Sequence, residues 1–352
     1  MSITVGVVGC GNIARFHFPG LEKAGARVKW VCDLDEGKAR PWAERFRAQH
    51  TPDHRLLVGD SALDAVFVLT ASAAHKRVCL DAIEAGHAVV CEKTLATNAD
   101  DALEIVQRAE QKGVVFFTSY MKRFIPAVEK AKELLPSLGP ITSTYIRSFQ
   151  PAGAIWHEMP SEGGFHTPSG GTSGIVRSYG GGALVCCGSH ILDLTCHFLG
   201  RPHRVYGLMH IPEGRDYDLQ ANALLETANG PVHYETIWHP LGHIGLLRDG
   251  WDERMEINGL NGRLDLYTSW WDQIDSKASL LVHYDNDTGS ATEYRYPPVS
   301  PFDRAVAFYC GNIERRTQGS QSHLTGYEVD ELIATIGRSS QQGEAVNVNW
   351  RA

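Results

Sequence analysis

Residues 5–14 read Val-Gly-Val-Val-Gly-Cys-Gly-Asn-Ile-Ala, a short apolar run that opens into the pattern Gly-x-Gly-x-x-Ala. Between a strand and a helix, the first glycine allows a tight turn, the second leaves room for a pyrophosphate, and the small last residue permits close helix packing. The phosphates then lie at the positive N-terminal end of that helix. A glycine-rich turn without a ligand is the alternative. The pattern predicts a dinucleotide-binding loop formed by Gly9, Gly11, Asn12, Ile13 and Ala14.

An acidic residue, Asp33, ends the next apolar run, about 20 residues beyond the glycine pattern, as this kind of site requires. Its carboxylate can accept hydrogen bonds from both hydroxyls of an adenosine ribose. The same charge repels a phosphate on the 2′ position. We therefore expect NAD as the cofactor, with NADP as the less favoured alternative.

The composition is that of a large globular protein with an acidic balance. The chain has 352 residues, enough for two domains. Its 33 basic and 41 acidic residues give a net charge of −8 without a basic run, which argues against binding nucleic acid or an anionic membrane. No stretch reaches the roughly 18 uninterrupted apolar residues of a membrane span, and a strand starts at once without a signal peptide, so we expect a cytoplasmic protein. We expect no structural disulfides, because apolar runs contain or adjoin Cys10, Cys32, Cys79 and Cys91.

Strand-like and helix-like segments alternate in the first third of the chain. The predicted helices include 77–85 and 100–112, and the predicted strands are 5–8, 28–32, 65–69, 88–91 and 114–118. Short buried strands between helices are typical of an α/β fold with a doubly wound parallel sheet and right-handed crossovers. We expect a Rossmann domain over residues 1–121.

The pattern changes beyond this point. A long Gly-, Pro-, Ser- and Thr-rich segment, 150–182, is predicted to be an ordered lid rather than a disordered insertion. Period-two alternation with Asn-Gly turns over 205–296 predicts an antiparallel sheet. We expect a second domain over 122–352, whose C-terminal helices can pack back on the first. Its other predicted elements are a strand at 141–148 and helices at 126–135, 183–199, 303–317 and 326–341.

Two segments carry candidate chemistry. Lys93 follows the predicted strand 88–91, at the sheet edge where open α/β sheets bind ligands; a surface lysine paired with Glu92 is the alternative. In the predicted helix 183–199, four polar residues fall at spacings of four, three and four, along one face. Side chains in such a stripe are catalytic, bind a metal such as zinc, or are buried polar groups whose hydrogen bonds are made within the core. Its members are Cys186, His190, Asp193 and His197.

These segments also carry a resemblance. The chain is similar, over nearly its whole length, to the glucose-fructose oxidoreductase, inositol dehydrogenase and rhizopine-catabolism (Gfo/Idh/MocA) family. The resemblance rests on the loop 9–14, on His75 with Ala-Gly-His-Ala-Val-Val-Cys-Glu-Lys at 85–93, and on Arg-Phe-Ile-Pro at 123–126. It continues through the three glycines 180–182, Ser-His-Ile-Leu-Asp at 189–193 and Leu-Gly at 199–200.

The family implies an N-terminal Rossmann domain and a C-terminal α+β domain with a large, mostly antiparallel, open-faced sheet that makes homodimers or homotetramers. It also implies hydride transfer, without a metal, between a nicotinamide cofactor and a secondary alcohol or ketone of a sugar, sugar derivative or cyclitol. Lys93 and His190 carry over as the catalytic pair. Histidine titrates near neutral pH and suits removal of the hydroxyl proton, while a lysine stabilises the developing alkoxide.

Two positions depart from the family pattern. Thr94 stands where the family has Pro, and Cys186 stands where it commonly has Asp, so a weakly hydrogen-bonding thiol replaces a carboxylate. Asp193 is a residue the family shares and is either structural or a partial substitute for that carboxylate. These departures keep a second interpretation open, a non-catalytic regulatory protein of the same fold that senses NAD or sugar.

Further contacts complete the prediction. The cofactor set adds residues at the ends of the third and fourth predicted strands and the helix that follows: Thr70, Ala71, Ser72, His75 and Glu92. An ordinary loop, and a histidine that caps or packs on a helix, are the alternatives there. Arg123 either orients substrate or makes an ion pair between domains. Besides the catalytic pair and Asp193, the predicted substrate residues are Tyr120, Arg123, Trp156, His157 and Arg177.

Overall fold

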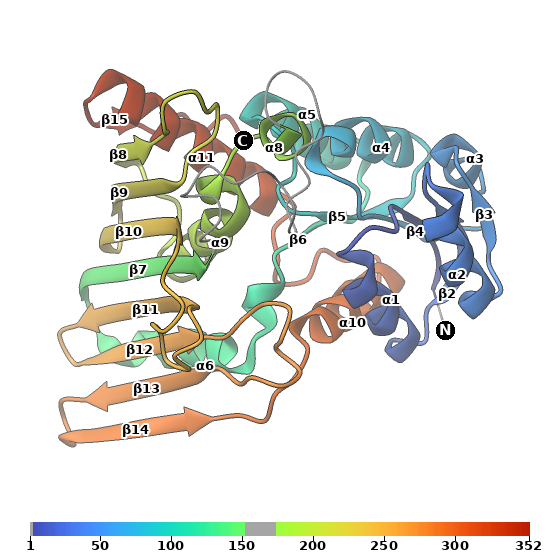
Figure 1. Ribbon diagram of the computed structural model, residues 1–352. Helices are drawn as coiled ribbons and strands as arrows, with labels where there is room; N and C mark the ends of the chain where they lie inside the picture. The colour runs from blue at the N-terminus through green and yellow to red at the C-terminus, as the bar shows by residue number, and fades with distance from the viewer. Residues whose placement is uncertain (1–2, 152–173) are drawn as a thin grey trace. The chain divides into compact units, whose positions relative to one another are not determined.

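The computed structural model describes residues 3–151 and 174–352. The chain divides into two compact units (Figure 1). The first consists of residues up to 121 together with 302–330 and 351–352, and the second of 122–301 with 331–350. The chain therefore leaves the first unit and returns to it.

The first unit contains a six-stranded parallel sheet in the order β3-β2-β1-β4-β5-β6. All five predicted strands are present, and the doubly wound parallel sheet is confirmed. The short edge strand β3 was not predicted, because its three residues are polar and do not form an apolar run. It pairs with β2. The strands are β1 (Thr4–Val8), β2 (Arg27–Cys32), β3 (Gln49–Thr51), β4 (Ala65–Val68), β5 (Ala88–Glu92) and β6 (Phe116–Ser119).

A helix follows each of the strands β1 to β5 along the chain, as expected for crossover connections between parallel strands. Side-chain caps start three of them, since Asp35, Asp53 and Asn98 each accept a backbone N–H of the first turn. The central strands are almost wholly buried apolar residues, as in a sheet covered on both faces. The helices are α1 (Ala14–Lys23), α2 (Glu36–Phe46), α3 (His54–Val58), α4 (Ser72–Glu84), α5 (Ala99–Lys112) and, late in the chain, α10 (Pro301–Glu314).

The late segment of the first unit closes its β6 edge. Gln318 accepts the Phe116 N–H at 3.1 Å, and the Gln321 side-chain amide donates to the Thr118 carbonyl at 2.7 Å. Phe302 stacks on Phe16 of α1, with ring centroids 4.8 Å apart. Residues 302–330 therefore satisfy backbone groups that an edge strand otherwise leaves open.

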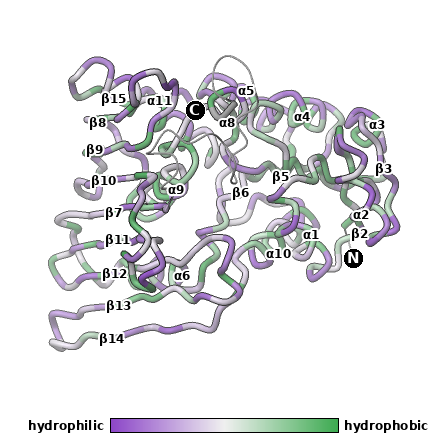
Figure 2. The backbone as a smooth tube through the Cα atoms, in the orientation of Figure 1, coloured by the Kyte–Doolittle hydropathy of each residue, from purple (hydrophilic) through white to green (hydrophobic). Residues whose placement is uncertain are grey.

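The second unit is built on a nine-stranded sheet in the order β14-β13-β12-β11-β7-β10-β9-β8-β15. The predicted mostly antiparallel sheet is confirmed, with one parallel pair, β7 with β10, in its interior. Buried and more exposed residues alternate along β7 and β10, and the second unit contains both hydrophilic and hydrophobic stretches (Figure 2). The strands are β7 (Ile141–Pro151), β8 (Arg204–His210), β9 (Gln220–Thr227), β10 (Gly230–His239), β11 (Asp252–Gly259), β12 (Gly262–Thr268), β13 (Leu280–Asp285), β14 (Ser290–Arg295) and β15 (Val346–Asn347).

Helices pack on one face of this sheet. Gly207 of β8 approaches the backbone of Ile336 so closely that a Cβ there would lie 2.9 Å from the Ile336 carbonyl oxygen. The other face leaves large apolar side chains exposed, among them Tyr145, Tyr206 and Leu208. The helical segments of the unit include η1 (Met121–Phe124), α6 (Pro126–Leu134), η2 (Leu135–Leu138), α8 (Gly174–Tyr179) and α11 (Thr325–Gln342), which continues from the first unit.

The predicted helix 183–199 is not a continuous α-helix. Leu184–Gly188 forms a π-helical turn, η3, and α9 (Ser189–Leu199) follows. Asp218 explains part of the irregular start, because its carboxylate accepts the N–H groups of Gly182 and Leu184 at 3.0 and 2.7 Å. The predicted stripe assumes regular α-helical spacing from Cys186 onward, and the π turn departs from that spacing at Leu184–Gly188.

The segment that precedes α9 is only partly described. The predicted loop 150–182 is in part regular structure, since β7 runs to Pro151 and α8 spans Gly174–Tyr179; residues 152–173 lie outside the described residues. Among the residues described, one stretch, Val176–Leu199, is long and apolar enough to cross a membrane, but 83% of its most apolar window is buried inside the protein. Its burial is that of a core helix.

Candidate active site

The predicted cofactor residues of the first unit lie at one edge of its parallel sheet. The glycine loop follows β1, Asp33 follows β2, Thr70 and Ala71 follow β4, and Glu92 ends β5 immediately before Lys93. Parallel strands present their carboxyl ends at a common edge, where open α/β sheets bind ligands. The fold therefore gathers at this edge residues that are up to 84 positions apart, from Gly9 to Lys93.

The glycine loop has the backbone shape that a dinucleotide needs. Gly9 has φ +101°, and a Cβ there would lie 2.6 Å from the backbone of Leu69, so a side chain does not fit. A Cβ on Gly11 would meet nothing within 4 Å, which leaves space beside the backbone. Ile13 starts α1 without a side-chain cap, so first-turn N–H groups can hold phosphate. These residues fit an NAD(P) pyrophosphate.

Asp33 is hydrogen-bonded to the backbone of the glycine loop. One carboxylate oxygen accepts the Cys10 N–H at 2.7 Å, and the other accepts the Asp35 N–H at 2.9 Å. An ionised carboxylate has about four acceptor positions, so two remain for ribose hydroxyls. The carboxylate is therefore oriented by the loop that is predicted to bind the pyrophosphate.

Glu92 and Lys93 do not form a surface pair. Glu92 is 5% exposed, and its carboxylate accepts from His17 Nε2 at 2.7 Å and from the Lys93 N–H at 3.1 Å. Burial acts to raise the pKa of Glu92, but the hydrogen bond and charge of His17, together with the charge of Lys93, hold that pKa below its ordinary value. Glu92 is therefore an ionised, buried carboxylate beside Lys93.

The turn that follows Lys93 is held by side chains of α4. The Lys93–Thr94 peptide bond is cis. The Ser72 and Thr94 hydroxyl oxygens are 3.2 Å apart, and His75 Nδ1 lies 2.9 Å from the Thr94 carbonyl oxygen. The other His75 nitrogen lies 2.9 Å from the Thr70 carbonyl oxygen, so the fully buried ring bridges the loops after β4 and β5.

In the second unit, Asp193 and Arg123 form a buried ion pair. Asp193 is fully buried, and its two oxygens accept from Arg123 Nε and Nη2 at 2.6 to 3.0 Å. Both residues belong to the same compact unit, so this ion pair is not one between domains. Because Asp193 lies on α9, this ion pair holds the helix that also carries His190, three residues earlier. His190 is itself 8% exposed.

The other two members of the predicted polar stripe are His197 and Cys186. Burial, together with the charges of Arg123 and Lys132, lowers the pKa of His197 to about 3, so its ring is neutral. Cys186 is half-buried on the π turn. Within 3–151 and 174–352, no three His, Cys, Asp or Glu side chains are grouped as a metal site.

The remaining predicted substrate residues differ in position. Tyr120 is buried directly after β6, and Arg177 lies on α8. Trp156 and His157 lie outside the described residues.

Sequence reasoning missed three residues around Lys93 and Arg123. His17 lies three residues after Ala14, on the first turn of α1, which is a spacing that could have been noticed. Asp330 bonds the backbone of Ala96, and Glu253 pairs with Lys122, each over a separation of more than a hundred residues that no local pattern reports.

A six-stranded parallel sheet with a glycine loop, an acidic residue and a lysine at one edge defines a dinucleotide-binding protein of the Rossmann class. Residues 3–120 match a model of the Gfo/Idh/MocA family, described as an oxidoreductase family with an NAD-binding Rossmann fold. Residues 138–265 match the GFO/IDH/MocA C-terminal domain. The chain belongs to the Gfo/Idh/MocA family and is an NAD(P)-dependent oxidoreductase.

Named relatives extend this comparison. Inositol 2-dehydrogenase 2 of Saccharopolyspora erythraea is 30% identical over 277 residues, which are 76% of this chain and 74% of that protein. D-xylose 1-dehydrogenase (NADP(+)) 2 of Haloferax volcanii is 22% identical over 352 residues, 98% of this chain and 99% of that one. A levoglucosan dehydrogenase in complex with NADH and levoglucosan has a TM-score of 0.79 at 19% identity, with 99% of this chain and 100% of that chain covered. This structural likeness supports the fold.

Proposed function

We propose that the protein is a cytoplasmic, NAD-dependent dehydrogenase or ketoreductase acting on a secondary alcohol or ketone of a sugar, sugar derivative or cyclitol. The observation that carries the proposal is the position of Lys93, on a buried, side-chain-anchored turn at the sheet edge that also presents the glycine loop and Asp33. A purely binding protein has no need to anchor a lysine there. The curated relatives named above, dehydrogenases of inositol and xylose, supply the substrate class.

The proposed chemistry assigns a role to each unit. When bound, NAD⁺ accepts a hydride from the carbinol carbon. His190 removes the hydroxyl proton, and the Lys93 ammonium stabilises the negative charge that develops on the oxygen. Glu92 orients the Lys93 backbone through its N–H, while Arg123 and Asp193 hold α9, which carries His190. In the reverse direction His190 returns the proton to the carbonyl oxygen.

Spectrophotometry of the purified protein with NAD⁺ tests this proposal. A panel of cyclitols, aldoses and anhydrosugars is added, and NADH absorbance is followed. Turnover with at least one member supports the proposal. Binding of both NAD⁺ and a sugar in a calorimeter, without turnover of any panel member in either direction, would instead assign a regulatory role.

Asp33 is expected to set the choice of cofactor. In Asp33→Asn, the amide oxygen can still accept the Cys10 N–H, but the negative charge that repels a 2′-phosphate is lost. We expect the ratio of kcat/KM for NAD⁺ to that for NADP⁺ to fall about 10-fold or more, which corresponds to about 1.4 kcal/mol. Steady-state kinetics with both cofactors measure it, with Asp35→Asn as the control. An unchanged ratio contradicts the assignment.

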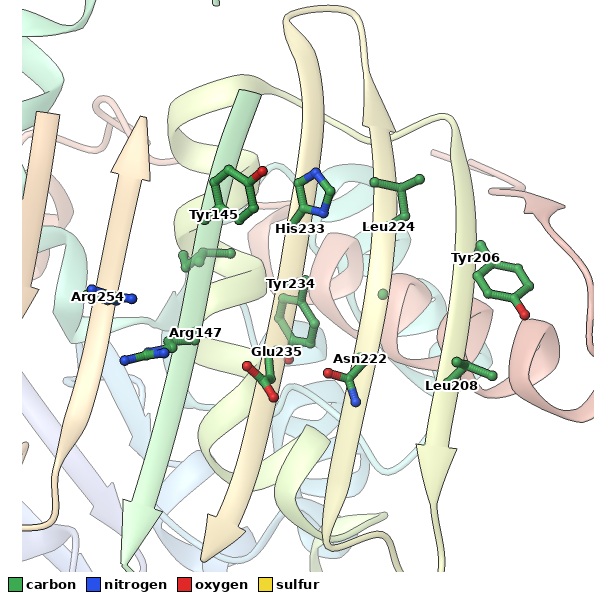
Figure 3. Close-up of a pocket in the computed structure, with 12 residues that line it drawn as sticks. Tyr145, Arg147, Tyr206, Leu208, Asn222, Leu224, His233, Tyr234, Glu235 and Arg254 are labelled. Carbon is green, nitrogen blue, oxygen red and sulfur yellow. The ribbon is translucent and has the colours of Figure 1, made fainter. Parts of the chain in front are cut away.

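We also propose that the protein forms a homodimer or homotetramer through the exposed face of the nine-stranded sheet. Two rows of side chains cross four neighbouring strands of this face (Figure 3). One row contains Tyr145, stacked on His233 at 4.4 Å, with Leu224 and Tyr206 beside them; the other contains Arg147, Glu235, Asn222 and Leu208. Exposed apolar side chains bordered by polar ones are typical of protein interfaces.

Charged substitutions in this face are expected to dissociate the oligomer. Leu208 is 52% exposed and Leu224 is 39% exposed, so glutamate at both positions places four like charges in a two-fold symmetric contact without disturbing the core. We expect Leu208→Glu with Leu224→Glu to sediment as a monomer. Leu260→Glu, at a 61% exposed turn position, is the control and keeps the native state. A monomeric parent protein would refute the proposal.

A further inference from the structure

Arg254 and Glu235 are two charged residues on the exposed face of the nine-stranded sheet. Arg254 belongs to β11 and Glu235 to β10, both side chains are half-buried, and both line one open pocket of about 380 Å³. Within residues 3–151 and 174–352, neither side chain forms a hydrogen bond or an ion pair. Their charges are therefore available to a partner outside the chain.

The two residues flank Arg147 in one row across three neighbouring strands (Figure 3). Arg254 is the register partner of Arg147 between β11 and β7, and Glu235 is its register partner between β7 and β10. Neighbouring strands lie about 4.8 Å apart, so the backbones of Arg254 and Glu235 are about 10 Å apart. Arg147 itself pairs with Asp252. Along the row, a positive charge, a neutralised pair and a negative charge follow one another.

Both outer charges are poorly stabilised in their own chain. Arg254 lies directly opposite Arg147, and like charges in register on neighbouring strands are destabilising. Burial raises the pKa of Glu235 above its ordinary value; the charge of Arg147 opposes this rise, and the charge of Asp252 adds to it. A counter-charge supplied from outside the chain would stabilise both groups.

A second copy of the chain can supply both counter-charges at once. In an isologous contact, rotation about a two-fold axis that lies in the interface along β7 exchanges the positions over β11 and β10. Arg254 then faces Glu235 of the partner subunit, and the reciprocal pair forms at the same time. Sheets packed face to face lie about 10 Å apart, a gap that an arginine and a glutamate side chain span together. Arg147 lies on this axis, where Asp252 neutralises its charge.

The other simple orientation has the two-fold axis across the strands. It would bring Arg254 opposite Glu256 of the partner subunit, because Glu256 lies two residues further along the same strand. However, Glu256 already pairs with Arg263 at 2.8 Å and accepts from the Asn258 side-chain amide at 3.0 Å. The charges of the face therefore favour the axis along β7.

We propose that a second copy of this chain docks on the exposed sheet face with its two-fold axis along β7, held by reciprocal ion pairs between Arg254 and Glu235. The proposal rests on the homo-oligomer proposed above and adds to it the orientation of the two copies and the residues that select it. The occupant is a second copy because the row of charges is complementary to itself.

Charge reversal at either position is expected to weaken the contact. Arg254→Glu brings two carboxylates together at both symmetric positions, and Glu235→Arg brings two guanidinium groups together. We expect each substitution to raise the dissociation constant of the dimer about 100-fold or more, because close like charges at an interface are strongly unfavourable. Analytical ultracentrifugation over a concentration series measures it. Arg40→Glu, at an exposed position of α2 in the first unit, is the control and leaves the constant unchanged.

An equimolar mixture of the two reversed variants is the decisive measurement. In a mixed dimer of Arg254→Glu with Glu235→Arg, opposite charges face each other again at both symmetric positions. One variant is labelled with ¹⁵N, so that native mass spectrometry separates mixed from unmixed dimers. We expect mixed dimers to predominate, with a dissociation constant within about 10-fold of the parent value. An interaction between the two residues within one chain cannot produce this rescue.

The remaining outcomes would overturn the inference. If both single variants associate as the parent does, or if mixing them gives no excess of mixed dimers, the proposed oligomer stands but these ion pairs do not hold it. Rescue of Arg254→Glu by Glu256→Arg instead assigns the axis across the strands. A monomeric parent refutes the oligomer and this inference together.

Circular dichroism shows whether a reversed variant is folded. If one is not, Arg254→Gln and Glu235→Gln take the place of the reversals, since they remove one charge without adding a like one. Each is expected to raise the dissociation constant about 10-fold. Parent-like association of both neutral variants would equally overturn the inference.

Discussion

Lys93→Met is expected to lower kcat by about 10²- to 10⁴-fold, the range associated with loss of a group that stabilises charge or transfers a proton in the transition state. Methionine matches the length of most of the lysine side chain but carries no charge, so the oxygen that loses its proton has no cation beside it. NAD(H) binding should persist, because the glycine loop and Asp33 are untouched. Single-turnover kinetics and calorimetry measure the two effects separately.

The control for this substitution is Lys112→Met, which removes a lysine at the C-terminal end of α5 that pairs with Glu84. It should retain full activity. His190→Asn is expected to lower kcat over a similar range, since asparagine keeps a hydrogen bond but cannot accept the hydroxyl proton. If either Lys93→Met or His190→Asn keeps near-normal turnover, that residue has no place in the proposed pair.

Glu253→Ala is expected to destabilise the protein by about 3–5 kcal/mol. Glu253 and Lys122 form an ion pair in which both side chains are 2% exposed, and Ser148 and Thr268 donate hydroxyl hydrogen bonds to the same carboxylate at 2.6 and 2.5 Å. Removal of the carboxylate leaves the Lys122 ammonium buried without its counter-charge. Urea unfolding followed by circular dichroism gives the change in the free energy of unfolding at constant m.

The double variant Lys122→Met with Glu253→Met tests whether charge is the cause. It removes both charges and keeps similar volumes, so it should recover about half or more of the loss, with the rest due to the unpaired hydroxyls of Ser148 and Thr268. A double variant as unstable as Glu253→Ala would show that volume, rather than an unpaired charge, sets the cost.

The nucleotide edge could be predicted because its signals are local. The run before Gly9, the glycine pattern and the distance to Asp33 all lie within one strand–helix–strand segment, and each has a direct backbone meaning. The parallel sheet followed from apolar runs whose lengths suit buried strands. Strand β3 was not predicted, because an edge strand needs little apolar character of its own.

The second unit was predictable in type but not in detail. Period-two alternation correctly indicated the large sheet. It could not indicate the parallel pairing of β7 with β10, because this pairing joins residues about 90 positions apart in the sequence. The π turn at Leu184–Gly188 likewise depends on Asp218 and on the close approach of Gly188 to Tyr234, where a Cβ would lie 2.2 Å from the phenolic oxygen. Helical periodicity cannot report such contacts.

The buried ion pairs and hydrogen bonds likewise could not be predicted from local sequence patterns. Arg123 and Asp193 were both selected from the sequence, but their pairing within one unit depends on how α9 packs. His17, Glu253 and Asp330 were not selected, because a single buried polar residue looks in sequence like any other polar residue. Their partners, Glu92, Lys122 and the Ala96 backbone, become visible only in three dimensions.

The return of residues 302–330 to the first unit has a consequence for biosynthesis. Strands β1 to β6 leave the ribosome early, but Gln318, which covers the backbone of Phe116, is made 202 residues later. Until that segment emerges, the β6 edge and the turn that carries Lys93 lack their cover, and a nascent chain in this state presents an open sheet edge to chaperones and to other chains. The nucleotide unit, although encoded first, receives this segment only after most of the sheet unit has been made.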